Sequence, residues 1–285
     1  MKKQAIYILL SMMLLISGCT GGSETAIQTS NGIAILDFSA LPKNVISGET
    51  VKLIYEIQNN GDYDTDIELY LQKIDTDLWN AVDTSKTISG LVKKQKEING
   101  GKEIGFFEVT APDIDKNTNE IHKAELKICY LYTTKTVFRY EVISSFEKQK
   151  EIEQGKYKKN LPFFQNSISP VLVYPLTKEP LYGETDEATV SFEVKNLKGG
   201  RIADLGSCEQ DPSAASINDF PFNIAVSDAA ITILCDENTV RLIDNKIIFY
   251  CTLTGIKDKN SFTLTLTSDY AYYETKETSL VVHGI

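Results

Sequence analysis

The sequence predicts an all-β protein built from two tandem immunoglobulin-like antiparallel β-sandwiches. Apolar and polar residues alternate with period two through most of the chain after residue 31, as in half-buried strands. Turn-forming Asn, Asp and Gly residues separate these runs, and no long stretch follows the helical period. The length of 285 residues corresponds to about two domains. We therefore expect one sandwich over residues 32–146 and a second over residues 166–285.

The N-terminus has the layout of a secretory signal. Lys2 and Lys3 precede an apolar run over residues 5–16, and the small residues Ser17 and Gly18 follow it. The run is shorter than the ~20 residues that a helix needs to cross the hydrocarbon core, which disfavours the alternative of a permanent membrane span. Residues 1–18 are thus expected to form a removable signal peptide.

The four residues 16–19, ending in Cys19, resemble the lipobox of prokaryotic lipoproteins. The resemblance implies cleavage before Cys19 and attachment of lipid to its thiol; an ordinary signal followed by an incidental cysteine is the alternative. Lipid chains would anchor the protein to the cell membrane on its extracytoplasmic side without spanning it. Residues 19–31 are rich in Gly, Ser and Thr and are expected to act as a flexible tether.

Charge limits the possible partners. The chain carries −10 at pH 7, and loss of Lys2 and Lys3 takes the mature form to about −12. An excess of acidic groups argues against nucleic acid as a ligand, because phosphates require basic surface. The same excess of acidic groups argues against binding to anionic lipid through a polybasic segment.

Each half contains a series of short predicted strands. In the first half, the apolar residues at 51–57 share one parity and those at 67–71 share one parity beyond the turn at Asn60-Gly61. Asn99-Gly100 predicts a hairpin, and separate strands are expected at 124–132 and 137–142. The charged segment 147–165 is predicted to be a solvated linker, with a turn or two of exposed helix. Strand patterns then resume; they lie at 170–176, 190–194, 231–235, 247–253 and 262–266.

The two halves resemble each other internally. Residues 55–59 match residues 192–196, and each match leads into a Gly-containing turn. The tyrosine pair 130/132 recurs 140 residues later at 270/272. This spacing is close to the 137 residues that separate the first two matching segments. Two matches at one spacing favour a duplicated domain, although chance similarity of amphipathic strands is the alternative.

Residues 32–72 also resemble a known module. Gly32 to Phe38, the Gly48-Glu49 turn, the alternating strand that follows it and Asn59-Asn60-Gly61 are similar to the opening of CARDB-type immunoglobulin-like modules of prokaryotic surface proteins. The resemblance implies a non-catalytic adhesion or binding module whose partner is an envelope protein or a cell-surface glycan. A structural or accessory subunit of an envelope assembly or secretion machine is the alternative. The chain lacks the Cys-Trp-Cys spacing of antibody domains.

Cysteines are the most informative chemical groups. Cys235 and Cys251 each share the parity of the apolar residues in their strands, so a disulfide between them is expected in an exported chain. Cys208 could compete for either of them, and Cys129 points away from the core-facing parity without a partner in its own half. Four reduced thiols are the alternative.

Other candidate sites are weaker. Asp62, Asp64 and Asp66 form a D-x-D-x-D run, but Ile67 and Lys73 stand where an EF-hand needs Gly and Glu, so a solvated acidic turn is favoured over calcium. No metal or cofactor is expected. The chain has two histidines, no G-x-S-x-G elbow and no Gly-rich phosphate loop, so we expect no enzyme; a hydrolase remains the third function class. The tyrosines at 130, 132, 270, 272 and 273 suit strand packing better than a sugar platform.

Overall fold

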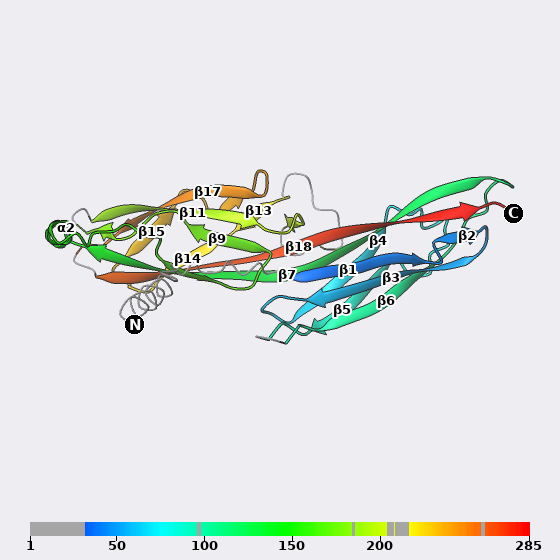
Figure 1. Ribbon diagram of the computed structural model, residues 1–285, viewed down its shortest axis with the longest axis horizontal. Coiled ribbons are helices and arrows are strands. Elements are labelled where there is room, and N and C mark those ends of the chain that lie inside the picture. Colours follow the sequence, from blue (N-terminus) through cyan, green and yellow to red (C-terminus); the bar gives the residue numbers. More distant parts are fainter. Residues whose placement is uncertain (1–31, 96–97, 184–185, 204–207, 209–216, 258–259) are drawn as a thin grey trace, which may run out of the picture.

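The computed structural model describes residues 32–95, 98–183, 186–203, 208, 217–257 and 260–285. In these ranges the chain is nearly all β, which confirms the predicted all-β sandwich class. The molecule is an elongated rod in which two groups of packed sheets lie end to end (Figure 1). The helix in the described ranges, α2 (Ser145–Glu153), lies at one end of the rod.

A ribbon of two long antiparallel strands runs through both halves of the rod. β7 (Asn119–Ile143) and β18 (Ser261–His283) pair continuously, from Glu141 with Ser261 to Asn119 with His283. Leu131 lies opposite Ala271 at the middle of this register. Figure 1 shows β7 and β18 crossing the molecule side by side. We call this pair the ribbon; it is the element on which both halves are built.

The first half packs a separate sheet against one end of the ribbon. That sheet has the order β1-β3-β6, and the ribbon sheet is extended by β4 and β5. β2 adds to it by parallel pairing with β18. The bounds are β1 (Ile33–Leu41), β2 (Asn44–Ile46), β3 (Thr50–Asn59), β4 (Thr65–Gln72), β5 (Ser85–Leu91) and β6 (Lys102–Thr110).

The second half repeats this plan at the other end of the ribbon. Its separate sheet has the order β15-β17-β11-β9, while β8, β10, β12 and β14 pair with the ribbon. β13 pairs with β16. The bounds are β8 (Phe163–Asn166), β9 (Val171–Pro175), β10 (Leu181–Tyr182), β11 (Glu187–Asn196), β12 (Arg201–Ala203), β13 (Asp219–Pro221), β14 (Asn223–Val226), β15 (Thr232–Cys235), β16 (Thr239–Arg241) and β17 (Lys246–Thr254).

Alternation in sequence decides which side chains enter the core. In β3, Val51, Leu53, Tyr55 and Ile57 are buried and the intervening residues are not, as expected from a strand with one face on the core. β4 follows the same rule with its own buried parity. β3 and β4 nevertheless lie in different sheets, so the turn between them crosses from one layer to the other.

The internal similarity has a structural counterpart. β3 and β11 are both central strands, in the orders β1-β3-β6 and β9-β11-β17. Each ends in a buried Asn that binds the following turn: Asn59 Nδ2 donates to the Tyr63 carbonyl at 2.8 Å, and Asn196 Nδ2 donates to the Gly200 carbonyl at 2.7 Å. The ribbon strands correspond too, because the tyrosine pair of β7 lies opposite the tyrosine pair of β18.

The sheets divide the chain differently from the predicted boundaries. β18 belongs by sequence to the predicted second domain, 166–285, yet its residues 272–283 pair with β7 in the first half and with β2. The predicted linker, 147–165, contains most of α2, which has a capping box at Ser144 and Glu147 and no buried residue. Each half therefore takes one end of both ribbon strands.

Candidate functional site

The outward face of the ribbon contains an unexpected buried stretch. Even-numbered residues of β7 face the core, and most odd-numbered ones are exposed or half-buried. Glu125, Lys127 and Cys129 break this pattern, because they face outward and are only 7%, 2% and 1% exposed. Buried charged groups are rare unless they are paired. This stretch therefore marks a place where the ribbon is covered on its outer side.

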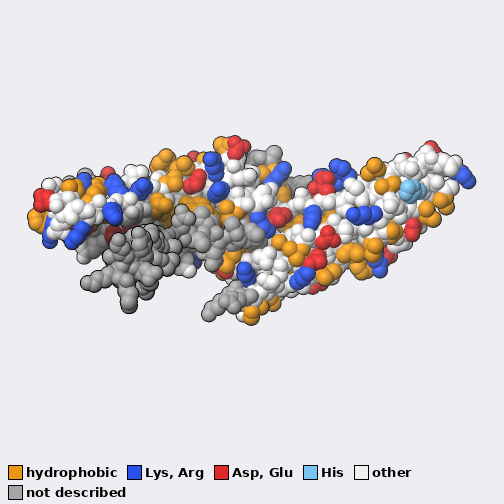
Figure 2. Space-filling view, viewed as in Figure 1, with side chains coloured by type: hydrophobic (Ala, Val, Ile, Leu, Met, Phe, Trp, Pro, Cys, Tyr) orange, Lys and Arg blue, Asp and Glu red, His pale blue; other side chains and the backbone are white. Residues whose placement is uncertain are grey.

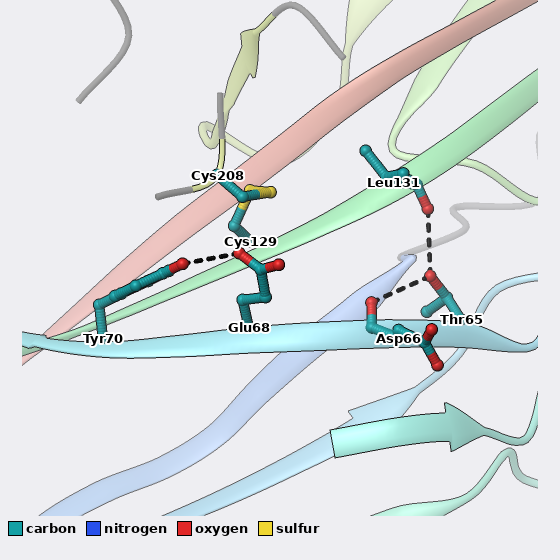
Figure 3. Close-up of a disulfide and its surroundings, with 7 residues drawn as sticks. All are labelled: Thr65, Asp66, Glu68, Tyr70, Cys129, Leu131 and Cys208. Atoms are coloured by element: carbon teal, nitrogen blue, oxygen red, sulfur yellow. Dashed lines mark hydrogen bonds between the residues drawn. A yellow bond between two sulfur atoms is a disulfide. The ribbon is translucent and has the colours of Figure 1, made fainter. Parts of the chain in front are cut away.

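A disulfide supplies part of the cover. Cys129 of β7 is bonded to Cys208, which follows β12 in the chain, and Figure 3 shows this bond on the outer side of the ribbon. The two cysteines pack with Ala203, Ala271 and Tyr273 in a small hydrophobic cluster apart from the main core. The sequence left Cys129 without a partner in its own half; its partner comes from the second half.

A groove of about 860 Å³ lies beside this disulfide. We call it the ribbon groove. Its floor is the ribbon, one wall is the end of β4, and the opposite wall is the start of β12 with the turn before it. The lining residues are Gln72, Lys73, Glu125, Lys127, Gly199, Gly200, Arg201, Ile217, Tyr273, Glu274 and Thr275.

Lys127 lies on the floor between two aromatic rings. Its Nζ is 5.8 Å from the centre of the Tyr70 ring and 5.2 Å from that of Tyr273. Aromatic faces attract cations at such distances, more strongly where water is excluded. The Tyr70 hydroxyl donates to Glu68 at 2.7 Å, which fixes that ring (Figure 3). The floor thus presents a positioned cation among aromatic rings.

Paired charges form the rims of the groove. Lys73 Nζ contacts Glu125 at 2.8 Å and also Glu277, and hydrogen bonds to these carboxylates raise the pKa of Lys73. On the other rim, Lys198 Nζ contacts Glu274 at 3.0 Å. Burial raises the pKa of Glu274, and the nearby Lys198 opposes that rise. These carboxylates are held by ammonium groups, so they position side chains rather than offer a free base.

The acidic run predicted as a turn lies beside a second, smaller hollow of about 550 Å³. Asp64 accepts a hydrogen bond from the Lys93 amide at 2.8 Å, and Asp66 accepts one from the Gly90 amide at 2.7 Å. Asp62 accepts one from the Ile168 amide. The three carboxylates thus bind backbone amides at the end of β5, just after β5, and between β8 and β9. In the described ranges, no three His, Cys, Asp or Glu side chains gather as metal ligands.

The aromatic residues at the strand ends pack rather than form a platform. Tyr130, Tyr132, Tyr270 and Tyr272 are all buried at the centre of the ribbon, where neighbouring rings lie 5.7 to 6.5 Å apart. Three of the four hydroxyls reach polar partners: Tyr272 donates to Asn196 at 2.8 Å, Tyr270 lies 2.8 Å from Thr134, and Tyr132 donates to the Ile168 carbonyl. Tyr273 has the opposite parity and lines the ribbon groove.

The remaining candidate residues lie apart from the groove. Cys235 and Cys251 are opposite each other on β15 and β17 and form the second disulfide of the structure. His122 Nε2 lies 3.3 Å from Glu120, and His283 Nδ1 lies 2.6 Å from Asn119, both toward the end of the rod opposite α2. Cys19 lies outside the described residues.

Loss of the Cys129–Cys208 disulfide is expected to be costly. The bond closes a loop of 79 residues, against 16 for Cys235–Cys251. The chain-entropy relation gives about 4.5 kcal/mol for the longer loop and about 3 kcal/mol for the shorter one. We expect Cys129→Ala with Cys208→Ala to lower the free energy of unfolding more than Cys235→Ala with Cys251→Ala, measured by urea denaturation. Equal losses would show that loop length does not decide the difference.

The fold and the groove together define an extended all-β sandwich protein with a polar groove on its ribbon. No family model and no curated protein sequence matches the chain. Among solved structures, a transglutaminase from red sea bream is similar at 11% identity and a TM-score of 0.21, over 90% of this chain and 32% of that one. In the described ranges no helix is long and apolar enough to cross a membrane.

Proposed function

We propose that the chain is a lipid-anchored extracytoplasmic protein that binds an envelope protein or a cell-surface glycan without catalysis, and that the ribbon groove is its binding site. The ribbon groove carries the proposal. Its lining combines an aromatic side chain, Tyr273, with the backbone of Gly200 and the charged side chain of Arg201. A lining of aromatic and polar groups suits polar ligands that have apolar faces, such as sugar rings.

The described part of the site is built on paired strands, which favours binding. Its floor belongs to strands that are paired on both sides, since β7 lies between β18 and β4, and β12 pairs with β18. The disulfide at Cys129 fixes one edge, and the ion pairs at Glu125 and Glu274 fix the rims. Groups that are already ordered lose little entropy when a ligand binds.

Arg201 offers a direct test. It lies on the groove wall and is exposed, so its replacement should leave the fold intact. We expect Arg201→Glu in residues 20–285 to weaken binding to purified envelope glycan or to a captured envelope protein by about tenfold, a loss of about 1.4 kcal/mol. The matched control is Arg139→Glu, at an exposed arginine on β7 outside the groove lining.

The outcomes separate the candidate functions. Loss of glycan binding in Arg201→Glu alone supports glycan recognition, whereas loss of one cross-linked protein partner supports protein recognition. A partner captured equally by both variants would place the contact elsewhere. The outer face of β6 would then favour a structural or accessory subunit, because Ile104 and Phe106 are exposed there. Turnover of a glycan abolished by Glu274→Gln would instead indicate a hydrolase.

A further inference from the structure

The end of the rod at α2 combines exposed apolar and basic side chains. We call this end the α2 pole: α2, the segment that follows it and the start of β8, residues 145–163. Phe146 and Ile152 of α2 are exposed, as are Leu161 and Phe163 beyond it. Figure 2 shows basic and hydrophobic side chains together at this end of the molecule. Exposed aromatic and aliphatic residues grouped in one place commonly mark a contact surface.

Lysines surround these apolar side chains. The α2 pole contains Lys148, Lys150, Lys156, Lys158 and Lys159 against three glutamates. Glu147 among the glutamates is engaged in the capping box of α2, where its side chain accepts from the Ser144 amide at 3.1 Å. A chain with a net charge of −10 thus has one end at which basic groups are in excess.

Two of the lysines are held in place by a tyrosine pair. The Tyr157 and Tyr182 hydroxyls are 2.5 Å apart. Lys148 Nζ lies 4.1 Å from the centre of the Tyr182 ring, and Lys159 Nζ lies 5.4 Å from it. The aromatic face orients the two ammonium groups at little cost, since cation–π contact at an exposed site leaves them hydrated. The basic surface is therefore ordered before it meets a partner.

The opposite end of the rod shows that apolar exposure alone does not decide the partner. Leu41 and Ile121 are exposed there, and exposed charged residues of both signs lie around them. The exposed charged residues near them along the chain or across a paired strand include Lys43, Glu49, Lys52, Asp113, Asp115, Lys116, Glu120 and Lys123, so basic and acidic groups are equal in number. An anionic surface would attract the α2 pole more strongly than this opposite end, where the two signs balance.

We propose that the α2 pole docks on an anionic lipid surface, with Phe146 and Phe163 entering the headgroup region and the lysines contacting lipid phosphates. Amphipathic surfaces with aromatic residues and lysines bind membranes in this way. The proposal revises the conclusion drawn from net charge, because the whole-chain value hides the local excess of lysines at the α2 pole. It holds for the folded chain whether or not lipid is attached.

The chain geometry is compatible with docking if Cys19 carries the lipid, as proposed above. Thirteen residues separate Cys19 from Ile33 and can reach about 45 Å when extended. Ile33 lies near the middle of the rod, because its carbonyl accepts from Lys198 and it pairs with Asn59. From there to the α2 pole the ribbon spans the 12 residues after Leu131, or about 40 Å.

The test uses residues 20–285, which lack the lipid site and keep every described residue. Co-sedimentation with vesicles of phosphatidylcholine alone is compared with vesicles that contain phosphatidylglycerol. We expect binding only to the anionic vesicles, and weaker binding at higher salt. Phe146→Ser with Phe163→Ser, and separately Lys158→Glu with Lys159→Glu, should each lower the partition coefficient at least about tenfold.

Matched controls lie at the opposite end of the rod. Leu41→Ser with Ile121→Ser removes side chains that are 61% and 74% exposed, against 61% for Phe163 and 77% for Phe146, and should leave binding unchanged. The proposal would be overturned if the Leu41/Ile121 variant lost as much vesicle binding as the Phe146/Phe163 variant. It would also be overturned if the unaltered chain did not bind anionic vesicles. Because the chain tested has no lipid anchor, this result is independent of whether Cys19 is lipidated and of what the ribbon groove binds.

Discussion

A chain that ends at Ala271 is expected to lose its folded first half. The deletion removes residues 272–285, which supply the fully buried Tyr272, Leu280 and Val282 and leave β7 without its partner over residues 119–130. Burial of one such side chain contributes about 1.5–3 kcal/mol, so three contribute about 5–9 kcal/mol. That amount is comparable to the whole stability of a typical domain, about 5–15 kcal/mol.

Protease resistance and thermal unfolding would check this expectation. The predicted first domain alone, residues 32–146, should likewise be unfolded, and co-expression with residues 261–285 should restore a folded complex, because that segment carries β18. The control is a chain that ends at Gly284, since Ile285 is 71% exposed and contributes little. Cooperative unfolding of residues 32–146 in isolation would contradict the shared-ribbon interpretation.

The difference between predicted domains and observed sheets has an identifiable physical origin. Thr133 to Thr136 interrupts the apolar pattern of β7, which suggested two separate strands at 124–132 and 137–142. The strand continues because the polar side chains find partners: Thr134 Oγ1 lies 2.8 Å from the Tyr270 hydroxyl, and Thr136 donates to Asn166 at 2.6 Å. These partners are at least thirty residues away, so local alternation carries no sign of them.

Pairing between strands was harder to predict than the strands themselves. The parity of β3 and β4 identified their buried faces correctly, but period two does not reveal which sheet a strand joins. Asn99-Gly100 predicted a hairpin, whereas β6 pairs along its length with β3. Between residues 93 and 98, the described pairing is a single bridge from Gln95 to Ile98.

The ribbon groove was missed because its cover comes from a distant segment. Local alternation gives no sign that Glu125 and Lys127 are buried, because their partners Lys73, Tyr70 and Tyr273 lie on other strands or turns. One signal was available. Cys129 faces away from the core parity, and in an oxidising compartment an outward-facing cysteine can bond to a segment above the sheet. The Cys235 and Cys251 parity, by contrast, placed both cysteines on one face of neighbouring strands, where the structure joins them.

The tyrosines at the centre of the ribbon are expected to make the protein unusually sensitive to alkali. Burial raises the pKa of Tyr130, Tyr132, Tyr270 and Tyr272 above the ordinary value near 10. In the unfolded chain the four phenols ionise near pH 10, while in the folded chain they stay protonated. The unfolded state therefore binds fewer protons above pH 10, and stability falls as pH rises.

The magnitude of this loss is large because the four groups act together. Each phenol contributes about 1.4 kcal/mol per pH unit above pH 10, so four contribute about 5.5 kcal/mol per unit until the folded-state pKa values are reached. Below pH 10 the stabilisation is fully present, so these four tyrosines should not make the free energy of unfolding depend on pH there. Urea denaturation between pH 8 and pH 11 should show a steep fall in the free energy of unfolding above pH 10 only.

Single substitutions separate the tyrosine cluster from general alkaline effects. Tyr270→Phe removes one ionisable group and should reduce the slope above pH 10 by about 1.4 kcal/mol per pH unit, although loss of the contact with Thr134 lowers the stability at pH 8 by about 1 kcal/mol. Tyr250→Phe is the matched control, because Tyr250 is 52% exposed and lies on the outer face of β17. An unchanged slope in Tyr270→Phe would mean that ionisation of the buried cluster does not drive alkaline unfolding, and that the ribbon opens without it.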